Sequence, residues 1–440
     1  FGSSIGPRGR WRARGGGGRG ACRGRLSMAA NGAPMLPEVA EFGQKYGLTD
    51  DAAQELQGLM SASITLTQKK VTVSVPASVA HLGPGLETCG MAVDIWDEIS
   101  LEYAEEFCIE ISGESAGEVP RAKDKNLAAA GAASAFEASG RPCPTLRIAC
   151  VHRIPWGKGL GARAASFVGG FLAGSVLCSE ELSCLAATDQ TNNLHRERSL
   201  AEVFNQRTAA DGSAGVEGPA ARKGSGGNVD ALLQSAISRG WNPGNVCPAI
   251  YGALQIGVET PNGLRSHRVP VPNGLVCVVF VPDGLGEAVP LPKQPVDRKA
   301  AIFNVGRTAL LINCFCTNDF GMFAKAAEDT LATAHTSKQF PWLATVLQSA
   351  LDAGATGAMP CGYGPSVLAL VTGRTGDVLA QSSSNELERA VAKAMISKAS
   401  EVGVPGRVLI AKPADAGAHV VAQKTELRTT EATERIVYFQ

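Results

Sequence analysis

The sequence predicts an α+β protein with two domains. Its 440 residues leave room for two domains that each bury a core of their own. Apolar runs typical of strands, such as residues 71–75 and 275–281, are interspersed with helical patterns such as residues 126–136. Strands and helices mix without a strict strand–helix–strand alternation, and this mixture defines the α+β class.

The overall composition indicates an ordinary globular protein. Hydrophobic residues make up 45% of the chain and charged residues 19%. Lys plus Arg and Asp plus Glu both total 41, so no net charge draws the whole chain toward nucleic acid or a membrane. No uninterrupted apolar run approaches the roughly 20 residues of a membrane span. We therefore expect a soluble protein without a membrane span.

The twelve cysteines are scattered and include no C-x-x-C pair. This spread in a long chain predicts buried thiols in a reducing compartment rather than a disulfide framework. The spacing does not support a zinc site, and we predict no metal site built by the protein.

Residues 1–37 differ in composition from the rest of the chain. Seven arginines lie among many glycines, and no acidic residue precedes Glu38. Such a segment cannot bury enough apolar surface to fold alone. Three interpretations remain: a transit peptide for a plastid or mitochondrion, a basic arm that contacts RNA, or an untranslated extension of a cytoplasmic protein that starts at Met28.

The elements expected in the first half follow from hydrophobic periodicity and capping residues. They are, in order, a helical segment at 38–66 with Asp50 or Asp51 as N-cap, a strand at 71–75 broken by 76–85, a strand at 91–102, a helix at 126–136 and a strand at 145–151. A polar, glycine- and serine-punctuated insertion follows at 179–228. The second half is expected to contain strands at 248–257 and 275–281 and helices at 304–313 and 340–353.

A glycine loop links the strand at 145–151 to a small-residue helix at 164–174. Gly157, Gly159 and Gly161 are spaced two apart in this loop. A strand, a glycine loop and a helix in succession direct backbone N–H groups and a positive helix end toward a phosphate group. Glycine permits both the close approach and positive φ angles. A plain tight turn is the alternative interpretation.

Three segments together resemble motifs of the galactokinase, homoserine kinase, mevalonate kinase and phosphomevalonate kinase superfamily, and within it homoserine kinase. They are residues 75–90 (VPASVAHLGPGLETCG), 154–165 (IPWGKGLGARAA) and 360–370 (PCGYGPSVLAL). Further similar stretches at 245–252, 303–307 and 415–421 follow in the family's order. The resemblance implies a two-domain small-molecule kinase fold, with an N-terminal ribosomal-S5-like domain and a C-terminal ferredoxin-like α/β domain. We assign these domains to 67–258 and 259–425, followed by a tail at 426–440.

The resemblance implies ATP and Mg²⁺ as cofactors. The implied nucleotide-binding positions are Gly157, Lys158, Gly159, Leu160, Gly161, Ala162, Arg163 and Asn126. Ala162 and Arg163 stand where the family has two serines, so the magnesium-holding hydroxyl is missing. Arg163 either grips phosphate directly or fills the phosphate position with its own charge. Lys158 either reaches phosphate or is solvated, and Asn126 is equally suited to cap a helix.

The implied substrate-pocket positions depart from the family as well. They are His81, Glu87, Asn242, Gly244, Asn245, Gly362 and Gly364. Gly244 replaces the family's aspartate, His81 replaces its asparagine, and Glu87 keeps the acid of its aspartate. Neither arginine for the substrate carboxylate is found: the segment 282–289 has none, and the other position falls near Thr336.

These departures predict a homoserine-kinase-like protein that has lost catalysis and serves as a binding or structural subunit, in a homodimer or a larger assembly. In that case ATP and Mg²⁺ are absent from its function. The alternative is an active ATP-dependent kinase of threonine biosynthesis, acting on homoserine or a related hydroxyl compound. Glu87 and Ser166 are the remaining catalytic candidates for that alternative.

Overall fold

The computed structural model describes residues 65–178, 227–261, 263–286, 295–372 and 378–428. Within it, Leu66–Glu426 forms one compact unit. The basic extension 1–37, the predicted helical segment with its Asp50 or Asp51 cap, and residues 179–226 of the predicted insertion lie outside the described residues, apart from residues 65 and 66.

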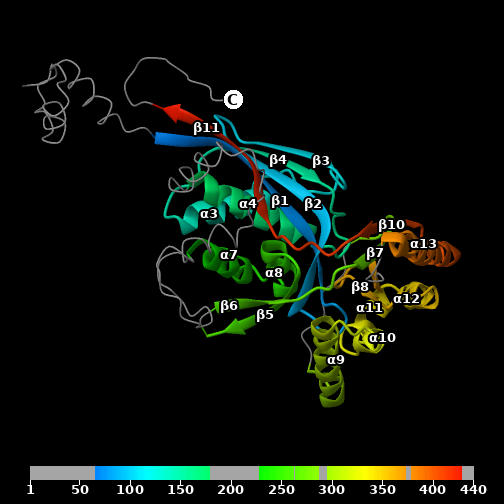
Figure 1. Cartoon of the computed structure of the whole chain (residues 1–440). Coiled ribbons are helices and arrows are strands. Elements are labelled where there is room, and N and C mark those ends of the chain that lie inside the picture. Colours follow the sequence, from blue (N-terminus) through cyan, green and yellow to red (C-terminus); the bar gives the residue numbers. More distant parts are fainter. Residues whose placement is uncertain (1–64, 179–226, 262, 287–294, 373–377, 429–440) are drawn as a thin grey trace, which may run out of the picture. The chain divides into compact units, whose positions relative to one another are not determined.

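The first layer of this unit is a mixed sheet covered by helices (Figure 1). Its strands are β1 (Thr65–Ala80), β2 (Cys89–Tyr103), β3 (Cys108–Gly113), β4 (Leu146–His152), β5 (Leu254–Thr260), β6 (Gly263–Val269) and β11 (His419–Arg428). The order is β11-β1-β2-β4-β3, and β5 pairs with both β2 and β6. The covering helices are α3 (Leu127–Ala138), α4 (Ala162–Cys178), α7 (Gly227–Ser238) and α8 (Pro243–Tyr251).

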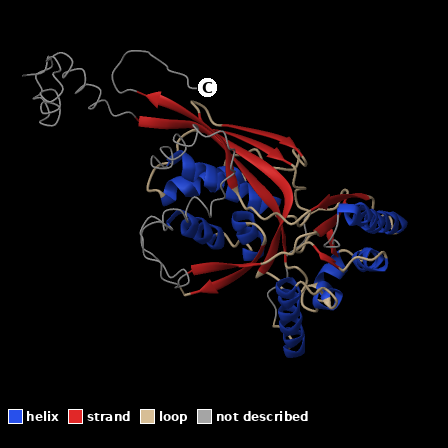
Figure 2. Cartoon of the chain, viewed as in Figure 1, coloured by secondary structure: helices blue, strands red, loops and turns tan. Residues whose placement is uncertain are grey.

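The second layer is a four-stranded antiparallel sheet in the order β10-β7-β9-β8. Its strands are β7 (Leu275–Pro282), β8 (Gly357–Pro360), β9 (Val367–Thr372) and β10 (Gly406–Ala411). The helices α12 (Leu343–Asp352) and α13 (Val378–Glu401) pack on this sheet. Figure 2 shows helices beside both sheets. In the chain, α9 (Arg298–Thr317), α10 (Phe323–Ala326) and α11 (Thr333–Gln339) lie between β7 and α12. Every residue of β7 is buried. The α+β class is confirmed.

The domain boundary predicted between residues 258 and 259 falls inside β5. The two sheets instead separate after Val269, because β6 pairs with β5 along its whole length. The chain also returns to the first sheet at its end, since β11 is hydrogen-bonded next to β1.

Most predicted elements are confirmed, with shifted ends. These are the strands at 91–102, 145–151 and 275–281 and the helices at 126–136, 164–174, 304–313 and 340–353. The predicted break after residue 75 is wrong: β1 continues to Ala80, and a register shift between Pro76 and Ala77 accommodates the proline.

The strand predicted at 248–257 is also wrong in its first half. Residues up to Tyr251 belong to α8, which Asn242 caps by accepting a hydrogen bond from the Gly244 amide at 2.8 Å. Pro243 occupies the first turn, where its missing N–H costs nothing. Gly252, with φ 71°, ends the helix, and β5 begins two residues later. At the end of the predicted insertion, α7 begins at Gly227.

The glycine loop joins the two layers through direct backbone packing. Gly159 has φ +82°, and a Cβ placed on it would lie 2.0 Å from the carbonyl oxygen of Cys361. Reciprocally, a Cβ on Gly364 would lie 2.5 Å from the nitrogen and Cα of Gly159. Gly161 packs in the same way against Ser78, with a Cβ-to-Oγ distance of 2.0 Å. These glycines are therefore required by the protein's own packing.

Two backbone hydrogen bonds hold the same junction. The Ser78 amide donates to the Leu160 carbonyl at 3.0 Å, and the Gly362 amide donates to the Ala80 carbonyl at 3.2 Å. The end of β1, the glycine loop and the turn after β8 thus meet at one place.

Of the helices that the structure describes, α9 is the one that is long and apolar enough, by length and composition, to cross a membrane. One side of it packs into the fold, where Leu311 and Phe315 are buried.

We expect Gly159→Ala to destabilise the protein by at least about 2 kcal/mol more than Gly140→Ala. Both glycines have positive φ, which costs a non-glycine residue roughly 1–2 kcal/mol. The Cβ at Gly140 meets nothing within 4 Å, whereas the Cβ at Gly159 meets the Cys361 carbonyl and forces a backbone shift. Urea unfolding of both variants measures the difference. Equal destabilisation would show that the junction does not depend on close packing.

Candidate functional site

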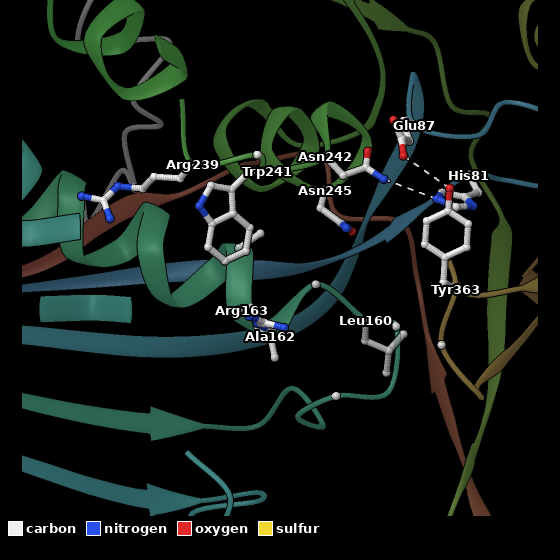
Figure 3. Close-up of a pocket in the computed structure, with 17 residues that line it drawn as sticks. His81, Glu87, Leu160, Ala162, Arg163, Arg239, Trp241, Asn242, Asn245 and Tyr363 are labelled. Atoms are coloured by element: carbon white, nitrogen blue, oxygen red, sulfur yellow. Dashed lines mark hydrogen bonds between the residues drawn. The ribbon is translucent and has the colours of Figure 1, made fainter. Parts of the chain in front are cut away.

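A cavity of about 370 Å³ opens beside the glycine loop (Figure 3). Its lining residues come from the segment after β1, the loop and first turn of α4, the segment between α7 and α8, the first turn of α8, and the turn after β8. They are His81, Glu87, Gly157, Gly159, Leu160, Gly161, Ala162, Arg163, Ala164, Arg239, Gly240, Trp241, Asn242, Asn245, Gly362, Tyr363 and Gly364. The structure thus brings together most of the positions identified in the sequence.

A buried carboxylate fixes the point where the glycine loop begins. Asp97 is fully buried on β2 and accepts hydrogen bonds from the amides of Arg153 at 2.7 Å and Ile154 at 2.9 Å. Its second oxygen lies 2.5 Å from Nδ1 of His152, which is also buried. Because the chain leaves β4 along these bonds, Asp97 determines the direction in which the loop starts.

Four positions identified in the sequence do not line the cavity, and three of them are Lys158, Ser166 and Asn126. Nζ of Lys158 donates to the Leu285 carbonyl at 2.5 Å and is largely buried. Oγ of Ser166 donates to the Ala162 carbonyl at 3.0 Å within α4. Asn126 caps α3, as one interpretation predicted: its Oδ1 accepts from the Ala129 amide at 3.0 Å. Ligand roles for these three residues remain predictions.

Gly244 also lies behind the cavity wall. A Cβ on it would be 2.7 Å from the Cys89 carbonyl oxygen, and a Cβ on Gly90 would be 1.7 Å from the Gly244 carbonyl oxygen. The Gly244 amide also donates to the Glu87 carbonyl at 2.8 Å. The backbone at this position is packed so closely on β2 that a side chain requires a shift.

One wall of the cavity consists of stacked arginine and aromatic side chains. The guanidinium carbon of Arg163 lies 6.0 Å from the ring centre of Trp241, and Trp241 stacks on Phe167 with ring centres 5.9 Å apart. On the other side, Arg239 lies 5.4 Å from the ring centre of Phe167 and donates to Oγ of Ser134 at 3.0 Å. In Figure 3 the guanidinium of Arg239 points away from the cavity, whereas Arg163 lies beside the loop.

His81 is a neutral group at the opposite end of the cavity. Its burial lowers its pKa to about 4, although the carboxylate of Asp329 acts in the opposite direction. Oδ1 of Asn242 is occupied by the Gly244 amide, so its Nδ2 faces Nε2 of His81 at 3.3 Å. Nε2 is therefore the acceptor and Nδ1 carries the proton, an assignment made from this hydrogen-bond network. No described residue accepts from Nδ1.

Tyr363 closes this end of the cavity. Its ring meets the His81 ring edge-on, with centres 4.1 Å apart, and its hydroxyl donates to Oε1 of Glu87 at 3.4 Å. Burial, and then the negative charge of Glu87, raise the pKa of Tyr363. The carboxylate of Glu87 is thus engaged by a neutral phenol.

Arg239, Trp241 and Tyr363 were not identified from the sequence. Arg239 and Trp241 come shortly before Asn242, and Tyr363 lies inside the segment 360–370, so proximity to a motif was the only available signal.

The cavity suits a phosphate group better than a magnesium ion. The loop amides precede a helix of 17 residues, and Arg163 adds a positive charge. Ala162 and Arg163 offer no side-chain oxygen, and Glu87 is the one carboxylate among the described lining residues. The described part of the chain contains no group of three or more His, Cys, Asp or Glu residues that could hold a metal ion.

Comparisons with known proteins identify several relatives. Residues 311–398 match the family described as GHMP kinases C terminal. Homoserine kinase of Moorella thermoacetica is 30% identical over 307 residues, which are 69% of this chain and 88% of that protein. Homoserine kinase of Clavibacter michiganensis is 30% identical over 313 residues, or 70% and 84% of the two chains. The crystal structure of homoserine kinase from Cytophaga hutchinsonii superposes with a TM-score of 0.59 at 22% identity, covering 80% of this chain and 98% of that one, which shows the fold alone.

We expect His81→Asn to make the stability of the protein less sensitive to acid. With a pKa of 6.5 in the unfolded chain and about 4 in the folded one, His81 is protonated first in the unfolded state as the pH falls. The folded state therefore loses stability between pH 6.5 and 4, by about 2 kcal/mol at pH 5. Asparagine suits the positive φ of 74° at this position and does not titrate. Unfolding free energies of both proteins at pH 7.5 and 5 measure the effect. Parallel pH profiles would contradict the burial of a neutral imidazole.

Proposed function

The chain belongs to the homoserine kinase family, and on this basis we propose that it is a homoserine-kinase-like protein with impaired phosphoryl transfer, kept as a binding or structural subunit. The observation that carries the proposal is the pair Ala162–Arg163 at the start of α4. Phosphoryl transfer depends on positioning the phosphates and neutralising their charge through bound magnesium. A methyl group and a guanidinium at this helix start provide no ligand for that ion.

The surrounding packing supports the same proposal. Gly244 stands where the family has an aspartate, and its Cβ position is already 2.7 Å from the Cys89 carbonyl oxygen. Ser166, a candidate to replace the missing hydroxyl, donates to a helix carbonyl. The Gly244 backbone leaves no room for a side chain, and the Ser166 hydroxyl is engaged within α4, so neither position supplies the missing group in this arrangement.

We further propose that Arg163 acts as an internal plug of the phosphate position. Its guanidinium lies beside Trp241 and lines the cavity at the positive end of α4. A fixed cation there neutralises part of the charge of a phosphate but leaves the rest without a partner when magnesium has no ligand. Weak nucleotide binding is the consequence, although the loop amides and glycines remain in place.

The alternative function is an active ATP-dependent kinase for homoserine or a related hydroxyl compound. The presence of Glu87 in the cavity favours it, because a carboxylate that shares the cavity with the glycine loop is one of the groups such a reaction needs. Glu87 would first have to exchange its bond from Tyr363 for one to a substrate.

We expect the purified full chain to show no homoserine-dependent ADP formation above background in a coupled assay with ATP and Mg²⁺. The loss of a single oxyanion-type donor lowers a rate by roughly 10²–10³, and more than one group differs here. Homoserine-dependent turnover near about 1 s⁻¹, the low end of typical kinases, would establish the alternative function and reject the proposed one.

We expect the double change Ala162→Ser and Arg163→Ser to strengthen nucleotide binding, because it removes the plug and supplies hydroxyl groups for magnesium. Calorimetric titration with ATP, with and without Mg²⁺, measures the effect. Arg239→Ser is the matched control: it removes a lining arginine whose guanidinium points toward α3, and it should not strengthen binding.

The opposite result would identify Arg163 as a phosphate ligand. In that case the double variant would lose roughly 1.5–3 kcal/mol of binding free energy, the magnitude of a charge-assisted hydrogen bond. Tighter binding of ATP by the natural protein than by the double variant would therefore disprove the plug.

A further inference from the structure

One end of the cavity carries negative charge and no positive charge. We call it the acidic end; its lining residues are His81, Glu87, Asn242, Asn245 and Tyr363. The carboxylate of Glu87 is exposed and accepts a hydrogen bond from the neutral phenol of Tyr363. Burial lowers the pKa of His81 to about 4, so its ring is uncharged at pH 7. A charged ligand at this end therefore meets a carboxylate.

A second carboxylate adds to the negative potential there. Asp329 accepts hydrogen bonds from the side-chain amide of Asn304 at 2.6 Å and from two backbone amides at the start of α11 at 2.8 and 2.7 Å. These donors are all neutral. The charge of Asp329 acts against the effect of burial on the pKa of His81. It also raises the pKa of Tyr363, in addition to burial and to Glu87. The potential of Asp329 thus reaches the acidic end.

Most hydrogen-bond donors at the acidic end are used within the protein. The amides of Gly362 and Gly364 donate to backbone carbonyls at 3.2 and 2.9 Å. Nδ2 of Asn242 faces Nε2 of His81 at 3.3 Å, and Nδ1 of His81, which carries the proton, is buried. Of the groups named here, the side-chain amide of Asn245 remains. A single amide does not replace the water that a carboxylate loses on binding.

The cations near the cavity lie away from the acidic end. Arg163 lies beside the glycine loop, 6.0 Å from the ring centre of Trp241. Arg239 donates to Oγ of Ser134 at 3.0 Å, and in Figure 3 its guanidinium points away from the cavity. Nζ of Lys158 donates to a backbone carbonyl. The cavity therefore places an arginine beside the glycine loop and a carboxylate at its other end.

We propose that the acidic end binds an ammonium group and excludes a carboxylate, so that the ligand of this cavity is an amino alcohol rather than an amino acid. This inference rests on the proposed function, because it places a ligand in the same cavity. An ammonium group only donates hydrogen bonds, and the carboxylate of Glu87 and the phenol oxygen of Tyr363 can accept them. A hydroxyl group both donates and accepts, which suits the neutral amide of Asn245. A carboxylate on the same ligand lies close to Glu87 without a cation and is repelled.

Three matched small molecules test this discrimination. L-Homoserine carries an ammonium and a carboxylate group, 3-aminopropan-1-ol lacks the carboxylate, and 4-hydroxybutanoate lacks the ammonium. Ligand-observed NMR titration of the full chain without nucleotide measures the three dissociation constants. We expect 3-aminopropan-1-ol to bind with a dissociation constant on the order of millimolar, as suits so small a ligand. It should bind at least about 10-fold more tightly than homoserine, because the homoserine carboxylate meets like charge.

The reverse ligand completes this comparison. Binding of 4-hydroxybutanoate should not be measurable. Homoserine or 4-hydroxybutanoate binding as tightly as 3-aminopropan-1-ol would overturn the inference, and so would the absence of any binding by 3-aminopropan-1-ol.

Two substitutions of the exposed Glu87 separate its charge from its place in the fold. Glu87→Gln should weaken binding of 3-aminopropan-1-ol at least about 10-fold, because it removes the charge that pairs with the ammonium group. Glu87→Lys should reverse the order, so that 4-hydroxybutanoate binds more tightly than 3-aminopropan-1-ol. Glu118→Gln, at an exposed position outside the cavity lining, is the matched control and should leave all three constants unchanged. Equal effects of Glu87→Gln and Glu118→Gln, or an unreversed order in Glu87→Lys, would contradict the proposal.

ADP formation with ATP and Mg²⁺, measured separately for each molecule, distinguishes this inference from the proposed function. Turnover of 3-aminopropan-1-ol with the expected order of binding would reject impaired catalysis and support the acidic end as an ammonium site. Tighter binding of homoserine without turnover would overturn the ammonium site and leave impaired catalysis standing.

Discussion

The contact between the backbones of Gly159 and Gly364 is the constraint on which the site depends. Neither residue tolerates a Cβ without moving the other chain segment. This contact brings a loop of the first layer against a turn of the second, and the hydrogen bond from the Gly362 amide to the Ala80 carbonyl adds the end of β1. The cavity exists because these three segments meet, and its size follows from backbone packing rather than from the polar side chains that line it.

Because backbone packing holds the three segments together, the site can keep its shape while the side chains that line it change. Asp97 directs the chain into the loop from a fully buried position on β2, without contributing to the lining. Arg163, by contrast, lines the cavity and lies beside the ring of Trp241. Ala162 and Arg163 line the cavity, whereas Gly159 packs on the Cys361 carbonyl, so we expect a substitution at Gly159 to disturb the loop more than one at position 162 or 163.

The sequence predicts the parts of this arrangement that depend on local patterns. The local patterns are the alternation of apolar residues, the glycine spacing and the Asn126 cap. From them the strands β2, β4 and β7 and the helices α3 and α4 are predicted correctly. The error at α8 arose because an apolar run of small residues suits a buried helix as well as a strand. The capping bond from Gly244 to Asn242 decides between them, and it is visible only in the structure.

The lining residues that were missed have a common physical cause. Trp241 belongs to the site because it stacks between Arg163 and Phe167, and Tyr363 because it meets His81 and Glu87 across the cavity. These partners are distant in sequence, so no spacing encodes them. The same limit applies to His81: its sequence position indicates a turn, whereas its low pKa and the proton on Nδ1 follow from burial and from the orientation of one amide. The charge and hydrogen-bonding state of a side chain in this cavity therefore depend on the packing around it as well as on its residue type.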